Sequence, residues 1–406
     1  LQGVAGFGVP IAVVAPLLIG IGFSPVLAVA APAIGHSWSV TFGDIASSFQ
    51  ALIAVTGLPG AFLAHWSAVF LGITTFMCGI AVVHLYGGMR LVRKNLAAIL
   101  IIGTVMAGTQ YLLAVTGLWS LAGFVAGLAG LVTGVLVSRL RFTQGRSDEL
   151  APDIPAESGV GMSMATAVSA YLVLIAIVTV AELADPVHEF LNAIKLTLSF
   201  PEVSTSQGWV VEAKTGKEIS VFGHAGALLL YTSVIGFLLY LARGYVTAGA
   251  ASRILKKTVD SGVSTSIGIV SMVCFALIMD QSGMTFLLAE GVSKALGPAY
   301  PVFASAVGTL GAFMTGSNTN SNVIFGGLQM QVAEIGGLSV AVILAAQTTG
   351  GSIGSMLAPA KILVGCSTVG LSGKEGPVLA TTIRYGAAMT VIIGLIALAV
   401  NFIQRA

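Results

Sequence analysis

The sequence has very little charge. Asp, Glu, Lys and Arg make up 8% of its 406 residues, whereas a soluble globular protein carries about 25%. Apolar residues make up 56% and the mean hydropathy is +0.97, so too few polar side chains remain to cover a water-soluble particle. A disordered chain is also excluded, because disordered segments are poor in apolar residues. We therefore expect an integral membrane protein.

Several functional motifs are absent. Three cysteines without a CxxC spacing exclude a disulfide scaffold and disfavour a zinc site, and a net charge of +2 is too small for a nucleic-acid-binding surface. Neither HExxH nor GxxxxGK followed by Ser or Thr occurs, so we expect no enzyme activity, no metal or cofactor and no ATP-driven pump. The chain starts inside an apolar run without Met, and we interpret it as part of a longer membrane protein.

Long uncharged stretches indicate membrane spans, because a helix needs about 20 apolar residues to cross the bilayer core. The stretches do not alternate as barrel strands do, so helices are favoured. The predicted spans are 61–86, 96–115, 119–137, 162–183, 226–241, 262–279 and 378–402.

Basic residues gather in three clusters, and cytoplasmic loops are rich in Lys and Arg. The clusters comprise Arg90, Arg93 and Lys94; Arg139, Arg141 and Arg146; and Arg243, Arg253, Lys256 and Lys257. Two predicted spans separate each cluster from the next, so the parity places all three loops on the cytoplasmic side. The acid-rich loop 184–224 then lies outside, and its residues 209–221 fit either a small β-hairpin around a Gly-containing turn or a plain surface excursion.

Two segments differ from ordinary spans. Gly and Pro interrupt residues 1–60 repeatedly, and residues 298–370 contain the polar runs 315–322 and 347–352. Consecutive Ser, Asn and Thr residues are costly in hydrocarbon unless the backbone is unwound and lines a cavity. We therefore predict two broken or re-entrant helix segments that meet near the membrane midplane.

The two segments resemble each other weakly when residues 24–39 are aligned with 339–354. The identical pairs are Ser24/Ser339, Ala30/Ala345, Ala31/Ala346, Gly35/Gly350 and Ser37/Ser352. Interrupted apolar segments in corresponding halves are typical of the central site of a secondary transporter. The predicted fold is an all-α, multi-span transporter with an inverted repeat, in which 1–86 belong to the first repeat, 87–260 connect, and 261–406 form the second repeat.

A helix that ends inside the bilayer presents free N–H groups and a positive dipole end, which bind anions. Ser, Thr and Asn side chains add neutral donors, so the polar runs favour a site for a small carboxylate. The alternative is that these side chains only hold helices together. The predicted substrate-binding residues are Thr315, Ser317, Asn318, Thr319, Asn320, Asn322, Gln347, Thr348, Thr349, His36 and Ser37.

Ionisable residues inside apolar segments are candidates for a function. We select His36, Asp44 and Lys361 as candidates for ion coupling. An imidazole can carry a proton near physiological pH, and Lys361 can be a counter-charge for an anion. The alternatives are a packing role for His36 and a Lys361 side chain that extends to the surface.

Several specific strings resemble those of one transporter family. They are GFGVPIA at 6–12, GIGF at 20–23, VTFG at 40–43, SGM at 282–284, GAFMTGS at 311–317, SN at 321–322, TTGG at 348–351 and VGLSGKE at 369–375. With these strings the sequence resembles the lactate permease family of bacteria and archaea. The resemblance implies a multi-pass protein of the cell membrane that transports L-lactate, D-lactate or glycolate by proton symport.

The sequence also departs from that family. Some members carry Asp where Asn318 stands, and Asn where Gln347 and His36 stand, so a titratable group is missing at 318 and His36 is one residue able to replace it. The alternatives to lactate–proton symport are sodium-coupled transport of another small organic anion, a passive anion channel and, third, a membrane enzyme. A channel would predict pore-lining repeats from several subunits.

Cysteine labelling in intact cells tests the predicted topology. We expect Ser147→Cys to be protected from a membrane-impermeant reagent and Thr215→Cys to react, because residue 147 follows a basic cluster and residue 215 lies in the acid-rich loop. Equal labelling of both variants from outside contradicts the topology.

Overall fold

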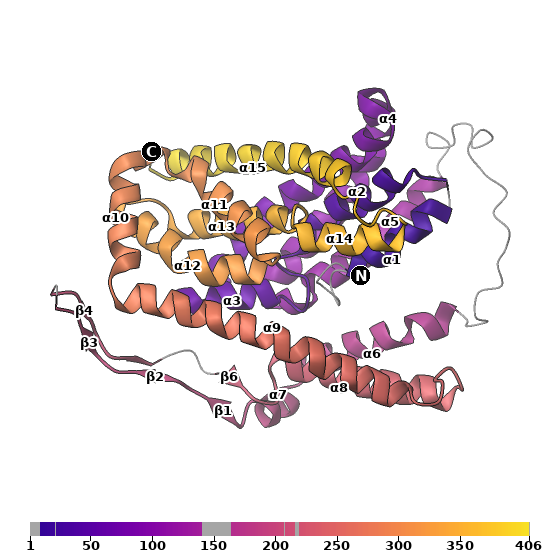
Figure 1. The fold of residues 1–406 in the computed structure, drawn as a ribbon, viewed down its shortest axis with the longest axis horizontal. Coiled ribbons are helices and arrows are strands. Elements are labelled where there is room, and N and C mark those ends of the chain that lie inside the picture. Colours follow the sequence, from indigo (N-terminus) through magenta and orange to yellow (C-terminus); the bar gives the residue numbers. More distant parts are fainter. Residues whose placement is uncertain (1–8, 21, 140–163, 207, 216–218, 406) are drawn as a thin grey trace. The chain divides into compact units, whose positions relative to one another are not determined.

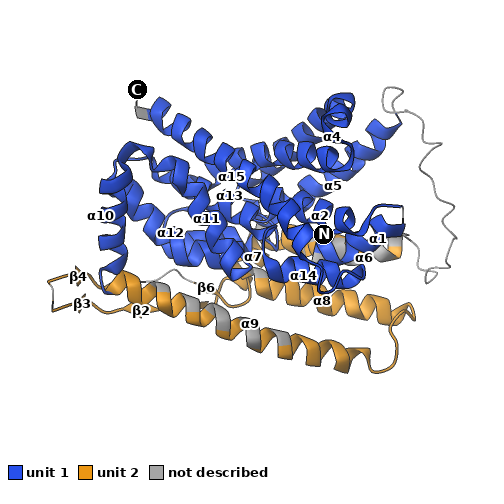
Figure 2. Cartoon of the chain, turned by 45° about the horizontal axis from the view of Figure 1, so that its top comes forward, with its two compact units in different colours: residues 1–154, 282–406 blue, residues 155–281 orange. Residues whose placement is uncertain are grey.

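The computed structural model of the chain describes all residues except 1–8, 21, 140–163, 207, 216–218 and 406. The described chain is mostly helical, as the composition predicts, and divides into two compact units (Figure 2). Unit 1 comprises residues 1–154 and 282–406, and unit 2 comprises residues 155–281.

Unit 1 combines short helices with long ones (Figure 1). Its first half comprises α1 (Val9–Gly20), α2 (Pro25–Gly35), the 3-10 helix η1 (Ser37–Ser39), α3 (Ser47–Thr56), α4 (Gly60–Val115) and α5 (Trp119–Ser138). Its second half comprises α10 (Met284–Leu296), the 3-10 helix η3 (Gly297–Ala299), α11 (Pro301–Thr315), α12 (Asn318–Ile335), α13 (Val340–Ser355), α14 (Pro359–Thr368) and α15 (Gly376–Arg405).

Unit 2 combines helices with one long β-hairpin. Its helices are α6 (Met164–Leu183), α7 (Asp185–Leu191), α8 (Ala225–Ala242) and α9 (Ala250–Gln281). Its strands are β1 (Lys195–Leu196), β2 (Ser199–Phe200), β3 (Val203–Ser204), β4 (Val210–Val211), β5 (Lys214–Thr215) and β6 (Ile219–Ser220). Their antiparallel pairs are β1–β6, β2–β5 and β3–β4.

A hairpin confined to 209–221 is therefore wrong. The strands of that segment pair with residues 195–204 and not with one another. The reversal lies earlier, where the Thr205 amide donates to the carbonyl of Trp209 at 2.8 Å and Gly208 has φ of 80°. Positive φ favours Gly at such a turn.

Among the described residues, four helices are long and apolar enough to cross a membrane. They are Gly60–Val115, Trp119–Ser138, Val340–Thr368 and Gly376–Gln404, and the bent pair Val273–Gln281 and Met284–Ala299 gives a fifth if it is one span. The predicted spans 61–86 and 96–115 both fall in α4, which bends at Gly87 and Gly88. Gly88 has φ of 65° and ψ of −170°, a conformation essentially limited to Gly.

The basic clusters at 90–94 and 253–257 are helical and do not lie in loops, which corrects the expectation. The first follows the bend in α4, and the second lies in the opening turns of α9. In both places a Gly with positive φ, Gly88 or Gly249, precedes the cluster. The chain therefore turns at the Gly, and the basic residues that follow can form helix.

Helix α13 lies at the centre of unit 1, where it packs against α4, α11, α12 and α15 (Figure 1). Its residues from 341 to 355 are all buried. Glycines allow α11 to approach α13 closely, because a Cβ atom on Gly308 would collide with the carbonyl of Gln347 and one on Gly350 with that of Ser305. The absence of side chains at these positions fixes the spacing of the two helices.

The polar runs are more regular than expected. The break before α12 is limited to Gly316, with φ of 75°, and Ser317, and the residues from Asn318 onward are helical. The run 347–352 lies inside the continuous helix α13. The expected unwinding of these runs is wrong, because their side chains find hydrogen-bond partners on neighbouring helices.

Two sets of helices in unit 1, α1–α4 and α12–α15, pack on each other reciprocally. Helix α3 packs on α12, and α14 packs on α1; α13 packs on α4, and α2 packs on α15. All four helices of each set therefore contact a helix of the other set.

Residues at corresponding positions of the two sets also take part in corresponding contacts. One apolar cluster contains Leu344 with Leu63 and Ala64. A second cluster brings Val29 together with Val378 and Leu379. In each case the counterparts, Leu344 and Val29, Val378 and Leu63, Leu379 and Ala64, are 315 positions apart.

Alanine substitution tests the glycine contact between α11 and α13. We expect Gly308→Ala to lower the free energy of unfolding by about 3 kcal/mol, because the added methyl group overlaps backbone atoms that cannot move aside. The matched control is Gly327→Ala in α12, where nothing lies within 4 Å of an added Cβ. Thermal unfolding in detergent measures both, and equal stability of the two variants contradicts the close contact.

Candidate functional site

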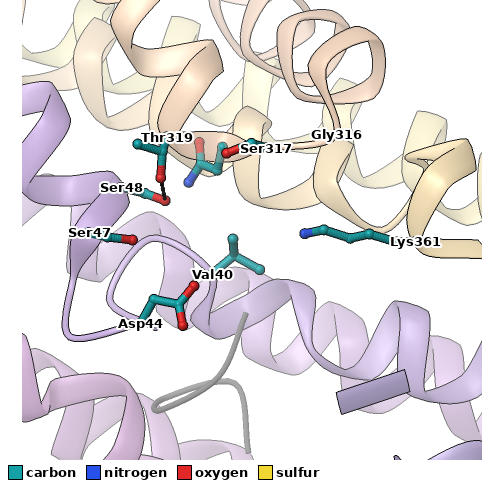
Figure 3. A pocket seen from close by; sticks show the side chains of 9 residues that line it. Val40, Asp44, Ser47, Ser48, Gly316, Ser317, Thr319 and Lys361 are labelled. Carbon is teal, nitrogen blue, oxygen red and sulfur yellow. Dashed lines mark hydrogen bonds between the residues drawn. The ribbon is translucent and has the colours of Figure 1, made fainter. Parts of the chain in front are cut away.

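A small cavity of about 40 Å³ lies in unit 1 where the interrupted segment 1–60 meets the polar run 315–322 (Figure 3). It is lined by Val40, Asp44, Ser47, Ser48, Gly316, Ser317, Asn318, Thr319 and Lys361. The predicted contact between the segments is confirmed, because Asn318 Nδ2 donates to Thr41 Oγ1 at 3.1 Å.

Three helices begin at this cavity. Helix α3 begins at Ser47, α12 at Asn318 and α14 at Pro359. The first turn of each contributes to the lining, with Ser47 and Ser48 from α3, Asn318 and Thr319 from α12, and Lys361 from α14. The first N–H groups of a helix have no partner within it, and the N-terminus carries a partial positive charge. Three such ends around one cavity make it favourable for an anion.

Two residues of opposite charge face the cavity. Lys361 is 6% exposed, and its amine donates to Ser355 Oγ. Figure 3 shows this amine directed into the cavity from α14, with the Asp44 carboxylate on the wall before α3. Lys361 and Asp44 are the charged residues of the described lining, so its formal charges sum to zero.

The chain before α3 adopts a left-handed turn. Asp44, Ile45 and Ala46 have φ of 50°, 52° and 57°, although this conformation costs roughly 1–2 kcal/mol for each residue that has a Cβ. The turn is held by the Gln50 amide, which donates to the Ala46 carbonyl at 2.8 Å. Strain of this kind gathers at functional sites, and here it fixes the direction of Asp44.

Hydroxyl and amide groups form the wall between the segments. Thr41 Oγ1 lies 2.8 Å from Ser352 Oγ and 3.1 Å from Thr348 Oγ1. Asn322 Nδ2 donates to Thr348 Oγ1 and to the Ser48 carbonyl, both at 2.9 Å. These neutral bonds hold α12 and α13 against the chain around α3.

Gln347 belongs to a separate buried network. Its Nε2 donates to Ser321 Oγ at 3.1 Å, and its Oε1 accepts from Gln329 Nε2 at 2.9 Å. Gln329 in turn accepts from the Tyr300 hydroxyl at 2.5 Å. Gln347 therefore connects α12 and α13 and does not line the cavity.

The remaining predicted residues also lie outside the lining. The Thr315 hydroxyl caps the end of α11 by donating to the Gly311 carbonyl at 2.8 Å. Ser37 Oγ donates to the Ile34 carbonyl at 2.9 Å, and His36 Nδ1 lies 3.1 Å from the Pro32 carbonyl oxygen. Asn320 and the fully buried Thr349 are absent from the lining as well.

The polar segments and the cavity fall within the region that matches a known family. The family described as L-lactate permease matches residues 1–404. The chain belongs to the L-lactate permease family. Membership of this permease family, together with the apolar helices, fits a multi-pass membrane transporter.

Members of the family with curated names cover almost the whole chain. L-lactate permease from Bacillus subtilis is 28% identical over 98% of this chain and 75% of its own length. L-lactate permease from Escherichia coli is 27% identical over 98% of this chain and 74% of its own length. The glycolate permease GlcA from Escherichia coli is 26% identical over 98% of this chain and 75% of its own length.

Among solved structures, the chain is similar to the YdaH transporter of Alcanivorax borkumensis. The TM-score is 0.39 and the sequence identity is 16%, over 97% of this chain and 85% of that chain.

Sequence reasoning missed four lining residues of this family member: Val40, Ser47, Ser48 and Gly316. Ser47 and Ser48 were detectable, because two consecutive serines open a helical pattern three residues after Asp44 and Ser is common at helix starts. Val40 carries no such signal in the sequence.

Glycine substitution tests the left-handed turn. Ala46→Gly removes the cost of positive φ, whereas Ala51→Gly in the regular helix α3 costs about 1 kcal/mol. We expect Ala46→Gly to be more stable than Ala51→Gly by about 2–3 kcal/mol. Thermal unfolding midpoints compare the two, and equal losses contradict the turn.

Proposed function

We propose that this chain is a secondary active transporter that moves lactate and related 2-hydroxymonocarboxylates, including glycolate, across the plasma membrane together with a proton. The names of its relatives, L-lactate permease and glycolate permease, support the substrate class. The observation that carries the proposal is the convergence of three helix N-termini and Lys361 on one cavity. This arrangement suits a small carboxylate.

The substrate carboxylate binds between Lys361 and the N-terminus of α12. An anion in a low-dielectric cavity needs several donors, because an unpaired buried charge costs several kcal/mol. Lys361 supplies the charge, and the amides of Asn318 and Thr319 at the start of α12 supply further donors. The hydroxyls of Ser48 and Thr319, which lie 3.0 Å apart on the cavity wall, pair with the substrate hydroxyl.

Proton symport is favoured over the other candidates because an acid stands beside the substrate site. Asp44 lines the cavity and can take up a proton as the anion binds. The alternatives are sodium-coupled transport of another organic anion and, less favoured, a passive anion channel. We expect no enzyme activity.

We further propose that residues 1–86 and 261–406 contain the two copies of an inverted repeat, connected by residues 87–260. The reciprocal packing of α1–α4 and α12–α15 supports a two-fold relation between the sets. His84 Nδ1 lies 2.7 Å from the Tyr385 hydroxyl, and the counterpart of Tyr385 in α4 is Phe70. The contact therefore joins two positions that are not equivalent in the two helices. Parallel helices related by a two-fold axis would place equivalent residues side by side, so the contact favours antiparallel α4 and α15.

Uptake by reconstituted vesicles tests the transport function. We expect labelled L-lactate to accumulate when the inside is alkaline, and unlabelled glycolate to compete. A sodium gradient imposed alone is expected to give no accumulation. Accumulation driven by sodium and not by protons supports the sodium-coupled alternative, and leakage that follows only the lactate gradient supports a channel.

Substitution of Lys361 tests the carboxylate site. A charge-assisted hydrogen bond contributes roughly 1.5–3 kcal/mol, so Lys361→Gln should raise the apparent KM for lactate by about ten- to a hundredfold. Propionate has the carboxylate but lacks the hydroxyl group. Its affinity as a competitor should fall by the same factor in Lys361→Gln, because Lys361 recognises the carboxylate. The matched control is Lys294→Gln, which removes an exposed amine paired with Glu290 at 2.7 Å. An unchanged KM in Lys361→Gln contradicts the site.

A further inference from the structure

The carboxylate of Asp44 occupies a cavity that is built to bind a carboxylate. It shares the lining with Lys361 and with the first residues of α3 and α12. In Figure 3 the carboxylate and the amine lie on opposite walls of the same space. The features that make this cavity suitable for a substrate anion therefore also stabilise ionised Asp44.

The cavity is too small for a second carboxylate beside the first. Its volume of about 40 Å³ corresponds to about three water molecules when a water needs roughly 10–15 Å³ by this measure. A lactate ion is larger than that, so its entry requires the lining to move. Two ionised carboxylates around one amine also repel each other, and like charges at close range favour protonation of one of them.

The backbone conformation prevents Asp44 from avoiding this conflict by simple rotation. Asp44 opens the left-handed turn that continues through Ile45 and Ala46, and Ile45 and Ala46 are buried at 1% and 0% exposure. The Ser47 amide donates to the Asp44 carbonyl at 3.1 Å and closes the turn. The apolar side chains thus anchor the turn and keep the carboxylate at the cavity.

We propose that Asp44 is an internal competitor of the substrate, and that its carboxylate must take up a proton before the substrate carboxylate binds Lys361. This inference rests on the proposed transport function. The charges balance, because the site is neutral in both states. In the empty site ionised Asp44 offsets the charge of Lys361. In the loaded site Asp44 is protonated and the substrate anion offsets the charge of Lys361. One proton therefore accompanies each monocarboxylate.

The other titratable groups around Asp44 are few. Lys361 faces it from α14, and His36 lies at the end of α2, where the charge of Lys361 acts on it. Helices α3, α5 and α13 contain no titratable residue. On α12 the only acid is Glu334, about 24 Å along the helix from Asn318.

Lactate binding measured against pH tests the inference in the purified full chain. Between pH 5.5 and 7, where Lys361 keeps its charge, we expect the affinity of the unmodified protein to fall by about tenfold for each pH unit above the range in which Asp44 is protonated. Asp44→Asn carries no ionisable competitor, so its affinity should vary less than about twofold over the same range. Asp185→Asn, an exposed acid in α7, is the matched control and should keep the original slope.

The outcomes separate the inference from the function on which it rests. An unchanged slope in Asp44→Asn overturns the inference, and loss of the slope in His36→Gln alone assigns the proton to His36 instead. Failure of the unmodified protein to bind lactate at any pH overturns the proposed function, and the inference with it.

A second measurement needs no variant of Asp44. Lactate is added to the unmodified protein in weakly buffered solution with a pH indicator, at a pH where Asp44 is ionised. We expect uptake of about one proton for each lactate bound, as the linkage between pH and affinity requires. Binding without proton uptake overturns the inference even if Asp44→Asn does not fold.

Discussion

A helix that ends inside an apolar body must find partners for its terminal N–H groups, and most of unit 1 follows from this constraint. Unpaired polar groups in such surroundings cost several kcal/mol each. Helices α3, α12 and α14 begin around one cavity, where hydroxyl groups, a carboxylate and an amine are gathered. Their combined dipoles favour an anion in this cavity more strongly than a single helix end would.

Neutral side chains hold these helix ends in place. Asn318, Asn322 and Gln347 are all buried and hydrogen-bonded to neighbouring helices. A buried amide that donates a hydrogen bond connects helices without the desolvation cost of an ion. The charges of the site are thereby limited to Asp44 and Lys361 among the described lining residues, which is the charge pair that the proposed exchange of a proton and a substrate carboxylate requires.

Part of this arrangement could be predicted from the sequence. Gly and Pro interruptions indicated the first half of the cavity and a polar run the second, and the predicted residues Ser317, Asn318, Thr319, Asp44 and Lys361 line it. Gln347 and Thr348 have the same composition signal, but they face other helices, and only packing distinguishes the two cases. The left-handed turn was not predictable, because Asp44, Ile45 and Ala46 include no Gly. The hairpin pairing was missed because its turn lies at 205–209, before the Gly-containing segment that the sequence suggested as the turn.

The two charges of the site belong to differently packed helices. Asp44 precedes α3, which packs on α12 and is bonded to it through Ser48 and Thr319, whereas Lys361 belongs to α14, which packs on α1. A rearrangement that moves α14 away from α3 therefore separates Asp44 from Lys361. In the empty site this separation breaks a pair of opposite charges, which is costly in a low dielectric. With a proton on Asp44 and a carboxylate on Lys361, each side is already neutral, so in the proposed cycle the loaded site opens at lower cost than the empty one.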